Sequence, residues 1–334
     1  MAGSDATSPR RPDALTLVER MRAGDRLALA RLITHVENRT PAVPAIMKAV
    51  HGAGRDTFVL GITGPPGAGK STVVDRLTAL LRERGHTVGI VAVDPSSPFT
   101  GGAVLGDRIR MQGHALDTGV FIRSMATRGA FGGLARATGN AIKLLAAFGF
   151  QWVLIETVGV GQTELDIMKL ADTTVVVLVP ESGDAIQTMK AGLMEAADVF
   201  VVNKADRAGA PALMAELKFA AHLAYTSPGA PRDIDWEVPV LATEAQAGTG
   251  ITELFDAIAQ HRAALTTTGA LQERRRARRR DELRALLVDE FMARVDERLR
   301  AGELATTFQR VADDEMDPYS AAQAVLAVLS LRPS

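Results

Sequence analysis

The sequence contains Gly64-Pro65-Pro66-Gly67-Ala68-Gly69-Lys70-Ser71, which matches the phosphate-binding loop G-x-x-x-x-G-K-[ST] at every fixed position. Its flanks agree with this match. Residues 57–63 form a short apolar run typical of a buried strand, and residues 71–84 carry apolar side chains at helical spacing. In such a loop the backbone N–H groups surround phosphates at the start of a helix. The order strand, loop, helix therefore predicts a nucleoside triphosphate site, rather than a glycine-rich turn with a surface lysine.

The residues of this loop have distinct expected roles. Lys70 can reach the outer phosphates, and the Ser71 hydroxyl can bind Mg²⁺. The backbone of the other residues is expected to follow the phosphate chain. The nucleotide-binding prediction for this part of the chain covers Gly64, Pro65, Pro66, Gly67, Ala68, Gly69, Lys70, Ser71 and Thr72.

The composition restricts the classes of protein to be considered. The chain has 334 residues, of which 47% are hydrophobic and 4% aromatic, with a formal net charge of −1 and no cysteine. A net charge near zero supplies no general attraction for nucleic acid. The absence of cysteine excludes disulfides and thiolate metal sites and agrees with a reducing, cytoplasmic location. The apolar runs are strand-sized, so no membrane span is predicted.

The pattern of elements predicts an α/β fold with helical additions at both ends. Residues 1–12 are polar and are expected to be a disordered tail, and residues 13–54 have the spacing of a helical extension. Residues 55–265 alternate strand-like and helix-like runs, as in a P-loop NTPase domain with a mainly parallel sheet. The expected strands are residues 57–63, 87–93, 120–123, 152–156, 173–179, 199–203 and 238–242.

Residues 266–334 carry no strand pattern and are predicted to form a helical arm. Residues 281–299 have an amphipathic helical pattern, and residues 321–331 form a second apolar stripe. The chain between them, which includes Asp313-Asp314-Glu315, is polar. An apolar stripe on an arm outside the main domain would be exposed, so we expect this arm to form a homodimer.

Two acidic positions follow the second predicted strand. Asp94 ends that strand and begins Asp94-Pro95-Ser96-Ser97, and Asp107 lies beyond a glycine-rich continuation. A carboxylate at the carboxyl end of a strand beside a phosphate loop can hold Mg²⁺ or one of its waters. The alternative is an Asp-Pro turn. The glycine-rich continuation favours a phosphate-sensing segment, with Asp94 and Asp107 as candidate metal residues.

The fourth predicted strand ends in Glu156-Thr157-Val158-Gly159, which has the D-x-x-G form of a nucleotide switch with Glu in place of Asp. Glu156 is a candidate metal and catalytic residue, and the Gly159 N–H is a candidate donor to the γ-phosphate. Val160 stands where many small GTPases carry a water-orienting glutamine. Gln162 is a candidate for that role, although it can equally be a residue at the start of a helix. We therefore expect slow intrinsic hydrolysis.

The sixth predicted strand ends in Asn203-Lys204-Ala205-Asp206, which matches N-K-x-D. An aspartate such as Asp206 can accept hydrogen bonds from N1–H and the exocyclic amine of guanine, whereas adenine would leave it unpaired. Glu244 and Ala245 follow the next predicted strand and occupy the loop expected to complete the base site. There the backbone N–H near Ala245 is expected to meet guanine O6.

The basic run Arg274-Arg275-Arg276-Ala277-Arg278-Arg279-Arg280 allows two interpretations. It could bind nucleic acid or an anionic membrane. It could also be a solvated helix face paired with nearby acidic side chains. We favour the second interpretation, because no aromatic residues are interleaved with the arginines and the chain has no net positive charge.

Three longer segments resemble the MeaB/ArgK family of GTPases. They are Val91-Ala92-Val93-Asp94-Pro95-Ser96-Ser97, Gly101-Gly102-Ala103-Val104-Leu105-Gly106-Asp107-Arg108-Ile109-Arg110-Met111 and Glu156-Thr157-Val158-Gly159-Val160-Gly161-Gln162-Thr163-Glu164. The resemblance implies a GTPase domain, a helical N-terminal extension and a C-terminal dimerisation arm. By motif match it implies Lys70 and Ser71 at phosphate and Mg²⁺, Asp94, Asp107 and Glu156 around Mg²⁺ and the switches, and Asn203, Lys204 and Asp206 at the base.

The resemblance also implies a role and a partner. Members of this family are GTP-binding and GTP-hydrolysing chaperones of adenosylcobalamin-dependent acyl-CoA mutases, in which they gate cofactor loading and protect the mutase. In two places the sequence departs from the family pattern. Glu244 stands where a serine is usual, and residues 122–129 resemble versions that accompany mutases other than the methylmalonyl one. The partner could therefore be a methylmalonyl-, isobutyryl- or 2-hydroxyisobutyryl-CoA mutase.

Two other functions remain open at this point. One is a kinase or NTPase linked to transport of basic amino acids, although no acceptor pocket or base is evident in the sequence. The other is a nickel-insertion GTPase, which is disfavoured because the chain has no cysteine and its six histidines are scattered.

Overall fold

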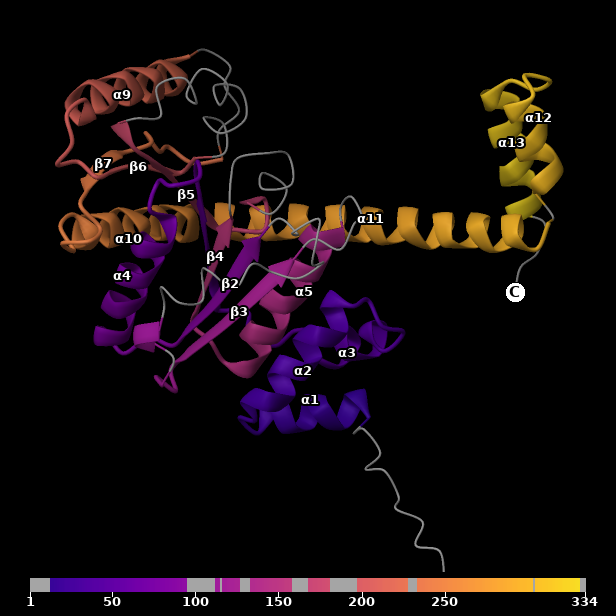
Figure 1. Ribbon diagram of the computed structural model, residues 1–334, viewed down its shortest axis with the longest axis horizontal. Helices are drawn as coiled ribbons and strands as arrows, with labels where there is room; N and C mark the ends of the chain where they lie inside the picture. The colour runs from indigo at the N-terminus through magenta and orange to yellow at the C-terminus, as the bar shows by residue number, and fades with distance from the viewer. Residues whose placement is uncertain are drawn as a thin grey trace, which may run out of the picture. The chain divides into compact units, whose positions relative to one another are not determined.

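The computed structural model describes residues 13–94, 112–114, 116–126, 133–157, 168–180, 197–227, 233–302 and 304–330 (Figure 1). By its internal contacts the chain divides into two units, Met1–Arg274 and Arg275–Ser334. The predicted start of the arm, residue 266, lies within the first unit. The predicted tail, residues 1–12, lies outside the described residues.

A parallel sheet forms the centre of the first unit. Over the described residues it has seven strands in the order β3-β2-β4-β1-β5-β6-β7, and every neighbouring pair is parallel. The strands are β1 (Phe58–Thr63), β2 (Val88–Asp94), β3 (Val120–Ala126), β4 (Trp152–Thr157), β5 (Thr173–Leu178), β6 (Val199–Asn203) and β7 (Val240–Thr243). All seven predicted strands are present, and the predicted α/β fold is confirmed.

Helices cover both faces of this sheet, because its strands are apolar on both sides. Alternate residues of β5 show the two faces. Val175 and Val177 belong to the core under α4 (Lys70–Glu83) and α10 (Ile251–Thr268), whereas Val176 and Leu178 belong to the core under α9 (Ala210–Thr226). The helices of the sheet are α4 (Lys70–Glu83), α5 (Gly133–Phe148), α9 (Ala210–Thr226) and α10 (Ile251–Thr268), with a short 3₁₀ helix at Gln112–His114.

Three N-terminal helices extend the core beyond α5. They are α1 (Ala14–Arg22), α2 (Arg26–Glu37) and α3 (Val43–Ala49), which agrees with the predicted helical extension. Their apolar sides share one core with α5 and the sheet. Arg26 donates to the carbonyl oxygens of Thr118, at 2.7 Å, and of Val120 at the start of the edge strand β3. Arg123 of β3 in turn pairs with Glu37 of α2. The helical extension therefore satisfies part of an edge that would otherwise face water.

The second unit contains most of α11 (Ala270–Arg300), together with α12 (Ala305–Ala312) and α13 (Pro318–Ser330). The helix predicted over residues 281–299 begins earlier than expected, because the arginine-rich segment before it is itself a good helix former. Within the polar stretch before α13, a short helix forms over residues 305–312. Val295, Leu304 and Ala321 are buried in this unit. No helix in the described parts of the chain is long and apolar enough to cross a membrane.

A buried polar cluster lies where β5 and β6 begin. Thr173 Oγ1 lies 2.7 Å from His261 Nδ1, and His261 Nε2 lies 3.2 Å from Asp198 Oδ1. Arg274 pairs with Asp198 at 3.3 Å and also with Asp233. The first arginine of the basic run is therefore paired with acids of the sheet domain, and the interpretation of the rest of the run stays a prediction.

This cluster leads to a pH-dependence of stability. The pKa of His261 lies below its ordinary value of 6.5, chiefly because burial disfavours the charged ring. Arg274 adds to the lowering, while Asp198 and Asp233 oppose it. An unfolded chain would bind a proton at this histidine as the pH falls through 6.5, whereas the folded chain binds it only at a lower pH. The free energy of unfolding is therefore expected to decrease below pH 6.5.

We expect the decrease between about pH 7 and about pH 5.5 to be of the order of 1 kcal/mol larger in the wild type than in His261→Gln. Urea unfolding at the two pH values measures it. The comparison uses the change in the free energy of unfolding between the two pH values. A loss of stability in the variant that is equal at both pH values therefore does not affect it. Equal slopes in the two proteins would contradict the assignment.

Candidate nucleotide site

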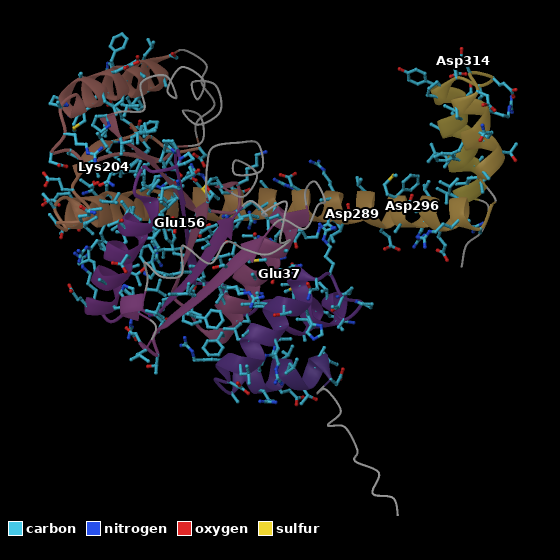
Figure 2. All side chains as sticks on the ribbon, in the orientation of Figure 1. Glu37, Glu156, Lys204, Asp289, Asp296 and Asp314 are labelled. Atoms are coloured by element: carbon cyan, nitrogen blue, oxygen red, sulfur yellow. The ribbon has the colours of Figure 1, made fainter. Side chains whose placement is uncertain are left out.

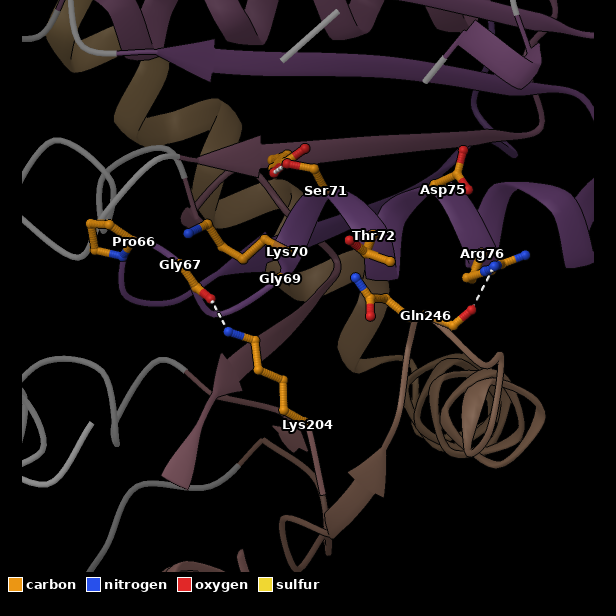
Figure 3. Close-up of a pocket in the computed structure, with 11 residues that line it drawn as sticks. Pro66, Gly67, Gly69, Lys70, Ser71, Thr72, Asp75, Arg76, Lys204 and Gln246 are labelled. Atoms are coloured by element: carbon orange, nitrogen blue, oxygen red, sulfur yellow. Dashed lines mark hydrogen bonds between the residues drawn. The ribbon is translucent and has the colours of Figure 1, made fainter. Parts of the chain in front are cut away.

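A pocket of about 740 Å³ opens where the phosphate-binding loop leaves β1 and enters α4 (Figure 3). Its walls come from the loop and first turns of α4, from the end of β4, and from the loops that follow β6 and β7. The lining residues are Pro66, Gly67, Gly69, Lys70, Ser71, Thr72, Asp75, Arg76, Glu156, Lys204 and Gln246. The predicted phosphate and switch positions therefore meet the predicted base loops in one cavity.

Two glycines give the loop its shape. Gly64 has φ +144°, and a Cβ there would lie 2.0 Å from the carbonyl oxygen of Val177 on β5. Gly69 has φ +88°, and a Cβ there would lie 2.3 Å from Nδ2 of Asn203. Both positions need a residue without a side chain, because the loop is pressed against the neighbouring strand ends. These close approaches hold the loop against the sheet without the help of a ligand.

The ammonium of Lys70 and the hydroxyl of Ser71 are directed toward the interior of the protein. Lys70 is buried, and its ammonium donates to the carbonyl oxygens of Gly64 and Pro65, both at 2.9 Å. The Ser71 hydroxyl donates to Glu156 Oε1 at 2.5 Å. The end of β4 and the start of α4 are therefore joined at the position where the sequence places the metal.

The parallel register explains this meeting of distant residues. Glu156 on β4 lies opposite Ile62 on β1, and the Thr157 hydroxyl donates to that of Thr63 at 2.9 Å. Figure 2 shows Glu156 at the end of β4, within the sheet layer. The side chain of Asp94 and all of Asp107, Gly159 and Gln162 lie outside the described residues, so their roles stay predictions.

Asn203 connects three loops of the pocket. Its side chain is buried, and its Nδ2 donates to the carbonyl oxygen of Ala68 at 2.8 Å. Its Oδ1 accepts from the Thr243 hydroxyl and from the Ala245 N–H, both at 3.1 Å. Each polar atom of the amide therefore bonds one wall of the pocket to the strand end of β6. In this structure the Ala245 N–H is directed at Asn203, and the next N–H along the loop belongs to Gln246.

The remaining base-recognition residues lie around this centre. Lys204 has φ +57°, and its ammonium donates to the Gly67 carbonyl oxygen at 2.9 Å, so its side chain crosses the phosphate loop (Figure 3). Asp206 is exposed and is not among the residues that line the pocket. Glu244 donates its N–H to the Thr249 carbonyl oxygen at 3.1 Å and is half-buried. The contacts predicted for Asp206, Glu244 and Ala245 with guanine stay predictions.

Sequence reasoning missed Asp75 and Arg76, whereas it placed Gln246 in the base loop without giving it a role. Asp75 and Arg76 occupy the second turn of α4, on the side away from its apolar stripe. Arg76 donates through Nε to the Ala245 carbonyl oxygen at 3.1 Å and through a terminal nitrogen to that of Gln246 at 2.7 Å. Asp75 lies 3.2 Å from His114. In the sequence these side chains look like an ordinary solvated face, because nothing in the pattern shows what packs beside that turn.

The comparisons with known proteins agree with this geometry. The sequence model of the family described as methylmalonyl Co-A mutase-associated GTPase MeaB matches residues 29–300. A protein of Pyrococcus abyssi is 50% identical over 310 residues, which cover 93% of this chain and 95% of that protein. The mouse protein named methylmalonic aciduria type A homolog, mitochondrial, is 35% identical over 267 residues, 75% of this chain and 64% of that protein.

One solved structure covers nearly the whole chain. The crystal structure of LAO/AO transport system kinase aligns with a TM-score of 0.66 and 26% identity, over 98% of this chain and 99% of that one. Together, the fold, the phosphate-binding loop and these relatives define the chain as a P-loop GTPase that binds guanine nucleotide. It belongs to the MeaB family of methylmalonyl-CoA mutase-associated GTPases. The family resemblance recognised in the sequence is confirmed.

Proposed function

We propose that this GTPase is a chaperone of an adenosylcobalamin-dependent acyl-CoA mutase, in which GTP binding and hydrolysis gate cofactor loading and protect the mutase. The observation that carries the proposal is the match of the mutase-associated family over residues 29–300. The name of the mouse relative, which refers to methylmalonic aciduria, supports the same proposal. The methylmalonyl-, isobutyryl- and 2-hydroxyisobutyryl-CoA mutases are the candidate partners, and a cytoplasmic location is part of the proposal.

Mg²⁺ is part of this proposal as well. Among the described residues, no group of three or more acidic or histidine side chains is placed to hold a metal alone. The Ser71 hydroxyl and the Glu156 carboxylate are nevertheless buried hard oxygen donors beside the phosphate loop, and they are joined at 2.5 Å. Such a pair fits Mg²⁺, which is usually held by few protein oxygens together with nucleotide phosphates and water. When bound, the ion would neutralise charge on the phosphates, with Asp94 and Asp107 as further candidate ligands.

The residues of the chain supply the rest of the hydrolytic site. Lys70 would bind the outer phosphates, the loop N–H groups would hold the phosphate chain, and Gly159 would donate to the γ-phosphate. Val160 cannot orient a water, and Gln162 is the alternative residue for that task. An incomplete water-positioning set suits an enzyme whose hydrolysis is slow alone and stimulated by a partner.

We also propose that the chain is a homodimer formed through α11 in the second unit. Leu283, Leu286, Leu287 and Phe291 lie on this helix with 57%, 45%, 60% and 38% of their surface exposed. Leu287, Val288 and Phe291 line one hollow together with Glu290 and Arg294. A row of large apolar side chains on one helix is typical of a protein contact. A second copy of the same helix would cover it with a self-complementary surface.

The test measures GTP turnover by the full-length protein with the mutase encoded nearest in the same genome, with and without adenosylcobalamin. We expect the mutase to bind and to accelerate GTP hydrolysis by about tenfold or more, because groups supplied by a partner protein can raise the rate of a GTPase. Heat-denatured mutase is the control. Light scattering of the same samples is expected to give a dimer of this chain.

Two results would contradict the proposal. One is the absence of binding and of any change in turnover with every such mutase of the organism. The other is phosphate transfer to arginine, ornithine or lysine added in place of the mutase, which would support the kinase alternative. A monomer by light scattering would contradict the dimer alone.

A further inference from the structure

Arg76 joins the helix that follows the phosphate loop to the loop that follows β7. Its guanidinium bonds two carbonyl oxygens in succession, those of Ala245 and Gln246, at 3.1 and 2.7 Å. Both Arg76 and Gln246 line the nucleotide pocket, and Figure 3 shows the bond between them at one end of it. The contact therefore forms part of the wall of the site.

The geometry of the peptide bond gives this contact a consequence for the pocket. A trans peptide is planar, and its C=O and N–H point in opposite directions. The carbonyl of Ala245 shares a peptide with the N–H of Gln246, and the carbonyl of Gln246 shares one with the N–H of Ala247. Because both carbonyls point at Arg76, both N–H groups point away from it. A cation on the two carbonyls also polarises these N–H groups as donors.

The loop is fixed from a second side by Asn203. The Ala245 N–H donates to Asn203 Oδ1, and Ala245 itself is 2% exposed. This bond occupies the N–H that the sequence assigns to the base, so the next donors along the loop are those of Gln246 and Ala247. Asn203 therefore holds the peptide before Ala245 through its N–H, and Arg76 holds the two peptides on either side of Gln246 through their carbonyls.

We infer that Arg76 is a positioning residue for guanine: it orients the N–H groups after Ala245 toward the 6-oxo oxygen of the base. It touches neither the phosphates nor the base itself in this role. The recognised feature is the 6-oxo group, which guanine and hypoxanthine share and adenine lacks. The 2-amino group, which only guanine carries, is left to Asp206. The two residues would then read two different edges of the same base.

The test compares the dissociation constants of GTP, ITP and ATP for the full-length wild type and Arg76→Ala. ITP keeps the 6-oxo group and N1–H but lacks the 2-amino group, so it removes one of the two hydrogen bonds predicted for Asp206 and leaves the group that Arg76 serves. We expect Arg76→Ala to weaken GTP and ITP by a similar factor, about fivefold to tenfold, and to leave ATP unchanged. The factor is modest because Arg76 is exposed, which weakens its hydrogen bonds.

Two further variants give the control and the rescue. Arg82→Ala removes an arginine of the same helix that pairs with Asp117 at 2.8 Å, away from the pocket, and should leave the ratio of GTP to ATP affinity unchanged. Arg76→Lys keeps one donor and should recover part of the GTP and ITP affinity. Equal weakening of GTP, ITP and ATP in Arg76→Ala would show a general structural role, and no change in any of them would show that the contact is idle. Either result overturns the inference.

Discussion

Replacing Lys70 by alanine is expected to abolish tight GTP binding while the protein remains folded. The ammonium of Lys70 is buried in the pocket and is held by the carbonyl oxygens of Gly64 and Pro65 at 2.9 Å. Phosphate oxygens are charged acceptors and therefore stronger partners for it than these carbonyls. Loss of the ammonium removes the only buried cation among the described residues that line the pocket. We expect GTP affinity to fall by roughly 100-fold or more.

The shift of the melting temperature on adding GTP measures this effect, because a ligand that binds only the folded state raises that temperature. The wild type should show a clear shift and Lys70→Ala almost none, while the two unliganded proteins melt within a few degrees of each other. Lys218→Ala, an exposed lysine on α9, is the matched control and should behave like the wild type. An equal GTP shift in Lys70→Ala would mean that this lysine does not bind phosphate.

Asn203→Ala is expected to damage both stability and nucleotide binding. The substitution breaks three hydrogen bonds, of 2.8, 3.1 and 3.1 Å, inside the protein. It leaves the Ala68 carbonyl, the Thr243 hydroxyl and the Ala245 N–H without the partner that joins them. Groups left unsatisfied in a buried site are costly, so we expect a loss of about 2–4 kcal/mol in the free energy of unfolding. GTP affinity should fall further, because the phosphate loop and the base loop lose their common anchor.

Chemical denaturation and GTP titration of the same variant separate the two effects. Thr243→Val is the graded control, since it removes only one of the three hydrogen bonds. Thr243→Val should lower the free energy of unfolding by about a third as much as Asn203→Ala, and it should weaken GTP binding less. If Asn203→Ala proves as stable as the wild type, or no worse than Thr243→Val, the amide does not hold the loops together.

The sheet and the phosphate loop could be predicted because their signals are local. β1 and α4 flank a motif whose fixed residues each have a backbone reason, such as Gly64 against the Val177 carbonyl. The other strands are near-continuous apolar runs rather than alternating apolar and polar residues, which is the pattern of strands buried on both faces of a parallel sheet. For the same reason the family resemblance, which rests on contiguous segments, could be recognised from sequence and is confirmed.

The contacts between segments could not be predicted in this way. The sequence assigns Asn203 to the base, but its bonds to Ala68 and Ala245 depend on how far β6 stands from β1 and β7. Arg76 reads as a solvated helix residue until the loop after β7 is placed beside it. The eight-residue helix α12 was missed because a short helix carries too few apolar residues to reveal a period. The acidic partners of Arg274 are likewise distant in the chain.

The hydrogen bond from Asn203 to Ala68 joins residues 135 positions apart, and Arg76 reaches Gln246 across 170 positions. Closing such long loops has a large entropic cost, so these contacts are expected to form late in folding, after the strands between them have assembled. The nucleotide pocket is therefore a product of the completed domain and not a local unit that could guide folding. During synthesis, the chain must emerge from the ribosome beyond residue 246 before the pocket is complete. Nucleotide can therefore bind and stabilise only those chains in which the sheet has already formed.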